Sequence, residues 1–203
     1  METLIIPKGI EKDKRRIGME ILLTRHGQTE WNLLKKVQGK ADIELNEKGI
    51  EQAETIRVSL KEERIDLILC SPLKRAIQTA EIINKGRNIR MIIDERVSER
   101  DFGEFEGMSN TDFDFNAFWS YKQNLKYDKA ENIKDFFRRV YKFLDSIKNE
   151  YAGKRILIVA HGGISIPVKC YFKGIPNVET LLPLGLENCE IAKYSYKKLD
   201  YER

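Results

Sequence analysis

The only two histidines of the chain each follow a short apolar run and precede a glycine. His26 comes directly after Leu22-Leu23-Thr24-Arg25, and His161 comes after Leu157-Ile158-Val159-Ala160. Such runs are typical of the buried strands of a parallel sheet, and open α/β proteins place their ligand crevices at the carboxyl ends of these strands. We therefore expect both imidazoles at one edge of a sheet.

Two arginines are expected at the same edge. Arg25 precedes His26, and Arg75 lies in the first turn of a helix that we expect to begin at Ser71-Pro72. Guanidinium groups match phosphate oxygens in bidentate geometry, and the positive end of the helix adds to their field. A neutral imidazole among these cations is a nucleophile, because the cations disfavour its protonated form. The pattern predicts an anion site where a histidine could attack phosphorus, although each residue alone also fits a structural role.

Predicted strands and helices alternate along the chain. Strands are expected at 19–24, 66–70, 90–93, 155–160 and 189–196, and helices at 46–63, 71–85, 131–149 and 163–172. In the first helix we expect Ile50, Ala53, Ile56 and Leu60 on the buried face, and the last helix is expected to be interrupted near Pro167. This order predicts a three-layer α/β/α fold with a mostly parallel central sheet.

The loop from 94 to 110 is polar and bears glycines, as functional loops often do. The aromatic-rich stretch 111–127 that follows has two interpretations. It forms either a short helical lid, which we place at about 108–130, or a segment whose aromatic side chains only cover the surface of the core. Its lysines, Lys122, Lys126 and Lys129, either bind a second anionic group of a substrate or are solvated.

Composition limits the class of protein. A chain of 203 residues with 41% hydrophobic residues is long enough for one domain, which we place at 19–203 after a flexible extension at 1–18. The 36 basic and 32 acidic residues are spread along the chain, so we expect no nucleic-acid partner. No window reaches the roughly 18 apolar residues of a membrane span. Three cysteines without a C-x-x-C pair indicate reduced thiols, a cytoplasmic protein and no metal site.

Five motifs in order resemble the histidine phosphatase superfamily, which includes the cofactor-dependent phosphoglycerate mutases and related phosphatases. They are Arg25-His26-Gly27 with Thr29, Trp31 and Asn32; Gln38-Gly39 with 42–49; 71–80 around Arg75; Glu99 with 102–107; and His161-Gly162-Gly163. The resemblance covers about 19–195 and is far more specific than the three-residue signature alone. One departure is the stretch Lys129-Ala130-Glu131-Asn132, which lacks the Gly-Glu-Ser that many relatives carry there.

The resemblance implies a role for each matching residue. His26 would be the nucleophile, while Arg25, Arg75 and His161 would hold the phosphoryl oxygens. Glu99 would protonate the leaving oxygen and then accept a proton from water. The other residues expected to line the phosphate pocket are Thr29, Asn32, Gln38, Gly39 and Gly162.

The resemblance leaves the fate of the phosphohistidine open. The short interval between Glu99 and His161, together with the motif at 102–107, favours a phosphatase that acts on a small phosphorylated substrate without a metal or other cofactor. A cofactor-dependent phosphoglycerate mutase is the alternative within the family. A phospho-ligand-binding module without turnover is the alternative from another class. No feature of the sequence specifies an oligomeric state.

Overall fold

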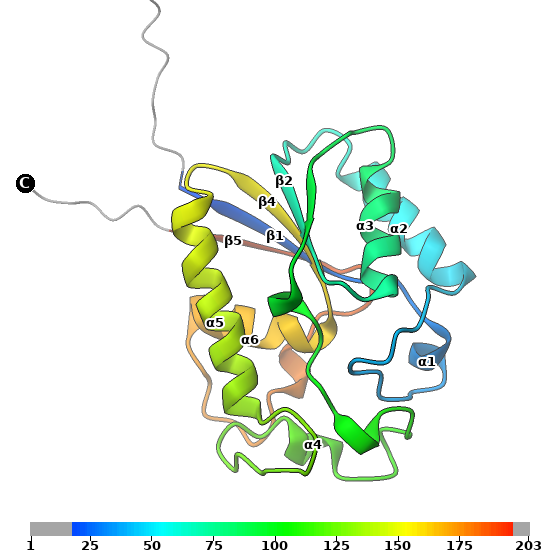
Figure 1. Ribbon diagram of the computed structural model, residues 1–203, viewed down its shortest axis with the longest axis vertical. Helices are drawn as coiled ribbons and strands as arrows, with labels where there is room; N and C mark the ends of the chain where they lie inside the picture. Colours follow the sequence, from blue (N-terminus) through cyan, green and yellow to red (C-terminus); the bar gives the residue numbers. More distant parts are fainter. Residues whose placement is uncertain (1–17, 197–203) are drawn as a thin grey trace, which may run out of the picture.

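The computed structural model describes residues 18–196, whose central element is one twisted sheet (Figure 1). The strands are β1 (Glu20–Arg25), β2 (Leu67–Cys70), β3 (Met91–Ile93), β4 (Arg155–Ala160) and β5 (Ile191–Ser195), in the order β3-β2-β4-β1-β5. Only β5 is antiparallel to its neighbour, so the predicted mostly parallel sheet is confirmed. The expected N-terminal extension lies outside the described residues, apart from Gly18.

The register of the three central strands determines where the site forms. Arg25, the last residue of β1, is opposite Ala160 of β4, and Cys70 of β2 is opposite Val159. The chain therefore leaves all three strands at one edge of the sheet. This edge receives His26 from β1, Ser71 from β2 and His161 from β4.

Helices cover both faces of the sheet (Figure 1). On one face, α2 (Glu47–Ser59) and α3 (Lys74–Asn84) pack against Leu22, Ile68 and Leu157. On the other face are α5 (Ile133–Glu150) and α6 (Gly162–Lys173). They pack against the intervening residues of the same strands, whose side chains point to this face. Burial on both sides explains why the strands are continuous apolar runs, and it confirms the three-layer prediction.

Two helix predictions need correction at their N-terminal ends. Helix α3 begins at Lys74 rather than at Ser71, because Ser71 still pairs with the sheet through its N–H bond to Val159 O. In α2, Ile50 is 47% exposed and Gly49 takes the buried position instead. A Cβ on Gly49 would lie 2.1 Å from Gln28 O, so the helix backbone packs directly on the turn after His26.

Helix α6 is continuous through Pro167, so the predicted interruption is wrong. Proline removes one N–H donor from a helix and crowds the carbonyl four residues earlier. Here that carbonyl belongs to Gly163, whose own position is fixed by the site described below. The buried side chains of Ile164, Ile166 and Val168 pack this helix against the core.

The remaining elements are short. They are α1 (Glu30–Leu33), the 3-10 helices η1 (Glu95–Val97), η2 (Gly103–Phe105) and η3 (Leu182–Leu184), and α4 (Phe115–Phe118). The aromatic segment forms a helix only over these four residues of α4 and otherwise consists of turns. Phe118 and Trp119 are buried, and Phe118 stacks on Tyr127 with ring centroids 3.8 Å apart. Much of the segment therefore covers core surface.

None of the helices formed by residues 18–196 is long and apolar enough to cross a membrane. The three thiols at Cys70, Cys170 and Cys189 are free.

Candidate active site

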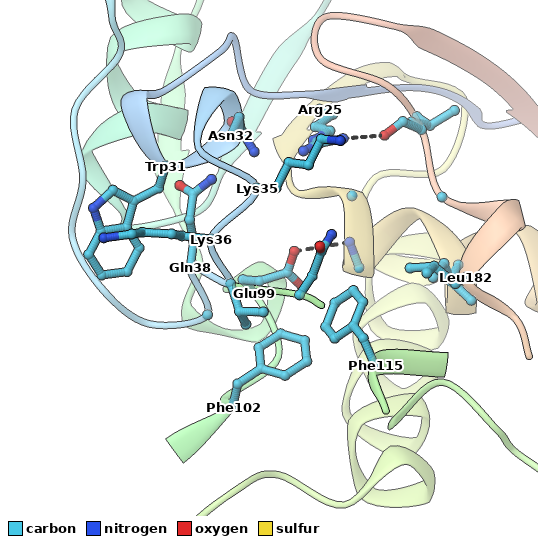
Figure 2. A pocket seen from close by; sticks show the side chains of 18 of the residues that line it. Arg25, Trp31, Asn32, Lys35, Lys36, Gln38, Glu99, Phe102, Phe115 and Leu182 are labelled. Carbon is cyan, nitrogen blue, oxygen red and sulfur yellow. Dashed lines mark hydrogen bonds between the residues drawn. The ribbon is translucent and has the colours of Figure 1, made fainter. Parts of the chain in front are cut away.

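A cavity of about 520 Å³ opens at the carboxyl end of the central strands (Figure 2). Most of the residues expected to form the site line this cavity. They are Arg25, His26, Asn32, Gln38, Gly39, Arg75, Glu99 and Gly162. Thr29 and His161 are not in the lining, and both are fully buried beside it.

The ring of His26 is held in one tautomer by the backbone. Its Nδ1 lies 2.7 Å from Gly27 O, and because a carbonyl can only accept, Nδ1 carries the proton. The other ring nitrogen, Nε2, therefore has a free lone pair. That lone pair accepts a 3.2 Å hydrogen bond from Arg75 Nε.

Backbone carbonyls anchor both arginines by their terminal nitrogens. Arg75 donates from Nη1 to Ala41 O (2.7 Å) and from Nη2 to Gly39 O (2.8 Å). Arg25 donates from Nη1 to Leu186 O (3.0 Å), and its Nε is buried without a partner. Each guanidinium is thus fixed in orientation, with the Nε of Arg75 directed at His26 and the Nε of Arg25 without a partner.

Burial and positive charge act together on the two imidazoles. The pKa of His26 is well below its ordinary value, first because the ring is buried and then because Arg75 and Arg25 lie nearby. The pKa of His161 is depressed for the same reasons. Burial also lowers the pKa of Arg75, to about 10, which leaves it charged at neutral pH. The site therefore combines neutral imidazoles with charged guanidinium groups.

Glu99 faces the same cavity with a carboxyl group whose protonation is favoured. Burial raises its pKa, and this effect exceeds the opposing effect of two backbone donors. These donors are Arg100 N–H to Oε1 (2.8 Å) and Gly163 N–H to Oε2 (2.9 Å). The carboxyl is thus fixed in direction, and its pKa is shifted toward the range useful for a general acid.

Thr29 has a structural role rather than a place in the pocket. It caps α1 by accepting the N–H of Asn32, while Asn32 Oδ1 accepts the N–H of Thr29 at 3.1 Å, which together form a capping box. The same Asn32 oxygen accepts from Asn188 Nδ2 at 3.3 Å. Because its oxygen is occupied, Asn32 can present only its amide N–H groups to a ligand in the cavity.

The ring of His161 packs edge-on against the ring of His26, with ring centroids 5.2 Å apart. Its Nε2 is 2.7 Å from Ser71 Oγ, whereas its Nδ1 is buried with no partner. Buried polar atoms are rarely left unpaired, which makes this nitrogen an unsatisfied polar atom beside the cavity. The serine expected to cap α3 is instead the partner that orients this histidine.

A second carboxylate organises the loop that carries Gln38 and Gly39. Glu106 accepts from the N–H groups of Lys40 (2.8 Å) and Ala41 (2.9 Å), and so ties this loop to the segment after Glu99. Gly39 has φ +50, and a Cβ there would lie 2.0 Å from Glu106 Oε1. Glycine is therefore required for the loop to bring its carbonyl to Arg75.

Several site residues have no clear signal in the sequence. Asn188 donates to His26 O at 2.9 Å, and Trp119 lines the cavity, although one lies in a polar loop and the other in the aromatic segment. Lysines do line the cavity, but not the predicted ones. Lys35 and Lys36 are in the lining, whereas Lys122, Lys126 and Lys129 are not, and Lys122 pairs with Glu179 on the surface.

Within residues 18–196, no cluster of three or more histidine, cysteine, aspartate or glutamate side chains is arranged to hold a metal ion. The arrangement that is present consists of an imidazole with a defined lone pair, two anchored arginines, a second imidazole and a carboxyl group. Such a set can bind a phosphoryl group and compensate its charge through protein side chains.

This fold and this site define an α/β protein built to bind a phosphoryl group. The chain matches the histidine phosphatase superfamily (branch 1) over residues 21–202 and belongs to that family.

Among its relatives, the phosphatase PhoE of Bacillus subtilis is 35% identical over 184 residues, which cover 89% of this chain and 93% of that protein. Phosphoserine phosphatase 1 of Hydrogenobacter thermophilus is 27% identical over 91% of this chain and 89% of that one. Among solved structures, YhfR of Bacillus stearothermophilus superposes with a TM-score of 0.78 at 30% identity, covering 86% of this chain and 90% of that one.

Proposed function

We propose that this protein is a metal-independent phosphomonoester hydrolase that acts through a phosphohistidine on His26. The observation that carries the proposal is the His26 ring, whose Nδ1–H is committed to Gly27 O while Nε2 faces Arg75 Nε at 3.2 Å. A substrate phosphate that replaces this contact accepts from Arg75 and meets the Nε2 lone pair. Phosphatases among the relatives support the same reaction class.

In the first half of the reaction, Nε2 of His26 attacks phosphorus, an N–P bond forms and the P–O bond to the alcohol breaks. Arg25, Arg75 and His161 stabilise the negative charge on the phosphoryl oxygens. The leaving oxygen takes a proton from Glu99, whose raised pKa keeps it protonated to higher pH than an exposed glutamate.

In the second half, water attacks the phosphohistidine. The Glu99 carboxylate takes the proton of the water, the N–P bond breaks and inorganic phosphate leaves. Glu99 and the His26 lone pair return to their initial states, so one phosphate ester and one water give one alcohol and one phosphate.

Hydrolysis of p-nitrophenyl phosphate in EDTA tests this proposal. We expect turnover in the chelator and its loss in His26→Ala. The intermediate is trapped by quenching a reaction with labelled substrate in alkali, where a phosphohistidine survives, and the label should leave the chain in acid. Label in the wild type but not in His26→Ala supports the covalent step.

Two other outcomes favour different functions. Absence of turnover from pH 5 to 8, with phosphate binding retained, indicates a phospho-ligand-binding module. Interconversion of phosphoglycerates that is stimulated by 2,3-bisphosphoglycerate indicates a mutase.

A further inference from the structure

Lys35 lines the pocket from a backbone conformation that favours glycine. Its φ is +54, in the left-handed region. It follows the C-terminal end of α1, where the N–H of Lys35 donates to Asn32 O (3.2 Å) and the N–H of Lys36 donates to Trp31 O (2.8 Å). These two bonds make a Schellman motif, whose left-handed position is most often glycine. A lysine here is an outlier, and outliers of this kind cluster at ligand sites.

The backbone around Lys35 is held in place from the other side of the pocket. Asn110 N–H donates to Lys35 O (3.0 Å), Val37 N–H donates to Met108 O (2.9 Å) and Gly107 N–H donates to Val37 O (2.8 Å). This short ladder joins the Lys35 loop to the end of the acid motif. The direction in which the Lys35 side chain leaves the backbone is therefore fixed by the fold.

The Lys35 ammonium has no acidic partner within 4.0 Å among the residues that the structure describes. In Figure 2 its side chain extends toward the part of the pocket that holds Arg25, while Lys36 lies along Trp31, with Nζ 5.8 Å from the ring centroid. The pocket's acidic groups are engaged elsewhere. Glu99 accepts two backbone N–H groups, and Glu187 lies 3.9 Å from Arg25.

The remaining walls of the pocket are largely apolar. The apolar side chains in the lining include Phe102, Phe115, Trp119, Ile166, Leu182 and Leu186. Beyond the phosphate position, the cavity thus offers apolar contact area together with one cation that has no partner in the described part of the chain. A bound molecule that satisfies both features has an apolar body and a negative charge separate from its phosphate.

We propose that Lys35 binds a second anionic group on the alcohol part of the substrate, which makes it a specificity-determining residue. The preferred substrates are phosphate monoesters whose alcohol combines an apolar body with a carboxylate or a further phosphate. This inference rests on the proposed hydrolase function and names the substrate class for the same site.

Two pairs of aryl esters of equal size test the proposal. They are 3- and 4-carboxyphenyl phosphate, and the corresponding carbamoylphenyl phosphates, in which a neutral amide replaces the carboxylate. Of the two carboxyphenyl phosphates, the better substrate is the one that the wild type hydrolyses with the higher kcat/KM. In Lys35→Gly we expect kcat/KM for this ester to fall about 10-fold, as one lost charge-assisted contact predicts. For its carbamoyl counterpart the change should stay within about 2-fold. The loss should be in KM, because the second anionic group takes no part in the reaction and is bound alike in the ground state and the transition state.

Lys129→Gly is the matched control. Lys129 also has a left-handed backbone, with φ +60, but it does not line the pocket. The control makes the same change of side chain and charge, and should leave all four esters within about 2-fold of wild type. Both variants should melt within about 3 °C of wild type, because glycine adopts this conformation readily.

An equal loss for the charged and neutral esters in Lys35→Gly, or no loss for either, overturns the proposal. Failure of wild-type protein to hydrolyse any aryl phosphate would instead contradict the hydrolase function. Equilibrium binding then tests Lys35 separately. His26→Ala should bind at least one carboxyphenyl phosphate more tightly than the carbamoylphenyl phosphate with the same substitution pattern. The double variant His26→Ala, Lys35→Gly should bind the two esters equally.

Discussion

The backbone N–H of Gly163 donates a 2.9 Å hydrogen bond to Oε2 of Glu99, and the same glycine leaves the carboxyl group the space it occupies. A Cβ on Gly163 would lie 2.1 Å from Glu99 Oε1 and 2.8 Å from Trp119 Cη2. Neither distance is compatible with non-bonded contact. The first turn of α6 thus fixes the carboxyl group of Glu99, while the strand before that helix ends next to His161.

Gly163→Ala is therefore expected to displace Glu99 while leaving the backbone of α6 intact. We expect kcat/KM for alkyl phosphates, which reports the step that protonates the leaving group, to fall at least about 100-fold, the usual scale of a lost general acid. The loss for p-nitrophenyl phosphate should be smaller, because its leaving group needs little protonation. Steady-state kinetics on the two substrates measure the difference. A uniform loss on both would show that the alanine damages the phosphate site rather than the acid.

Glu99→Gln tests the acid role directly. Glutamine keeps the shape of the side chain but has no proton to transfer at neutral pH. Because kcat/KM reports only the steps up to formation of the phosphohistidine, alkyl phosphates should lose at least about 100-fold in kcat/KM and p-nitrophenyl phosphate less than about 10-fold. Glu104→Gln is the control, because Glu104 belongs to the same loop but is exposed and outside the pocket lining. Equal losses on both substrates in Glu99→Gln would count against the acid role.

The strands and helices that carry the site residues are predicted well from the sequence, for a physical reason. Strands buried on both faces must be continuously apolar, as β1 and β4 are, and the polar residue that follows such a strand must lie at the sheet edge. His26 and His161 could thus be placed without any contact information. Arg75 could also be placed near them, even though its helix begins three residues later than expected.

The errors arise where one residue type satisfies two structural roles. A serine before a proline is a good helix cap, but Ser71 lies at the end of β2, where the register with β4 directs it to His161 instead. Thr29 shares a motif with Asn32, yet its hydroxyl is used in capping α1. Asn188 reaches His26 only because β5 pairs antiparallel with β1, which no local pattern indicates.

Acid stability provides a prediction for the two buried histidines. Their pKa values are lowered in the folded protein, so the unfolded chain binds more protons below its ordinary histidine pKa of about 6.5. The two histidines therefore lower the free energy of unfolding as the pH falls from about 6.5 toward 5. The raised pKa of Glu99 has the opposite effect on stability. The folded state holds that proton at higher pH than the unfolded chain, so this carboxyl group raises the free energy of unfolding as the pH falls.

His161→Gln isolates one histidine, because glutamine can still reach Ser71 and the Glu99 contribution is shared with wild type. Urea unfolding at pH 5.0, 5.5, 6.0 and 6.5 measures the slope of the unfolding free energy with pH. In the variant we expect this slope to be lower by about 1 kcal/mol per pH unit, close to the value for one proton. Identical slopes in the two proteins would mean that His161 is protonated in the folded state.

A partly buried ion pair between Arg139 and Glu131 supports the loop that carries Glu99. The guanidinium donates to both carboxylate oxygens of Glu131, at 2.9 and 2.8 Å, and to the carbonyls of Arg96 (2.8 Å) and Ser98 (3.0 Å). Glu131 belongs to the segment Lys129-Ala130-Glu131-Asn132, which lacks the Gly-Glu-Ser expected from the family resemblance. The next residue, Asn132, caps α5 through its side chain, so this segment serves the fold beneath Glu99.

Arg139→Lys keeps the charge but loses the planar fork, so it cannot satisfy the carboxylate and both carbonyls together. We expect a loss of about 2 kcal/mol in unfolding free energy, because partly buried acceptors are left unpaired. We also expect a larger fall in kcat/KM for alkyl phosphates than for p-nitrophenyl phosphate, since the Glu99 loop loosens. Arg138→Lys is the control, because its ion pair with Asp135 is exposed and should contribute less than about 0.5 kcal/mol. If Arg139→Lys loses stability but treats both substrates alike, Arg139 stabilises the fold without positioning the acid.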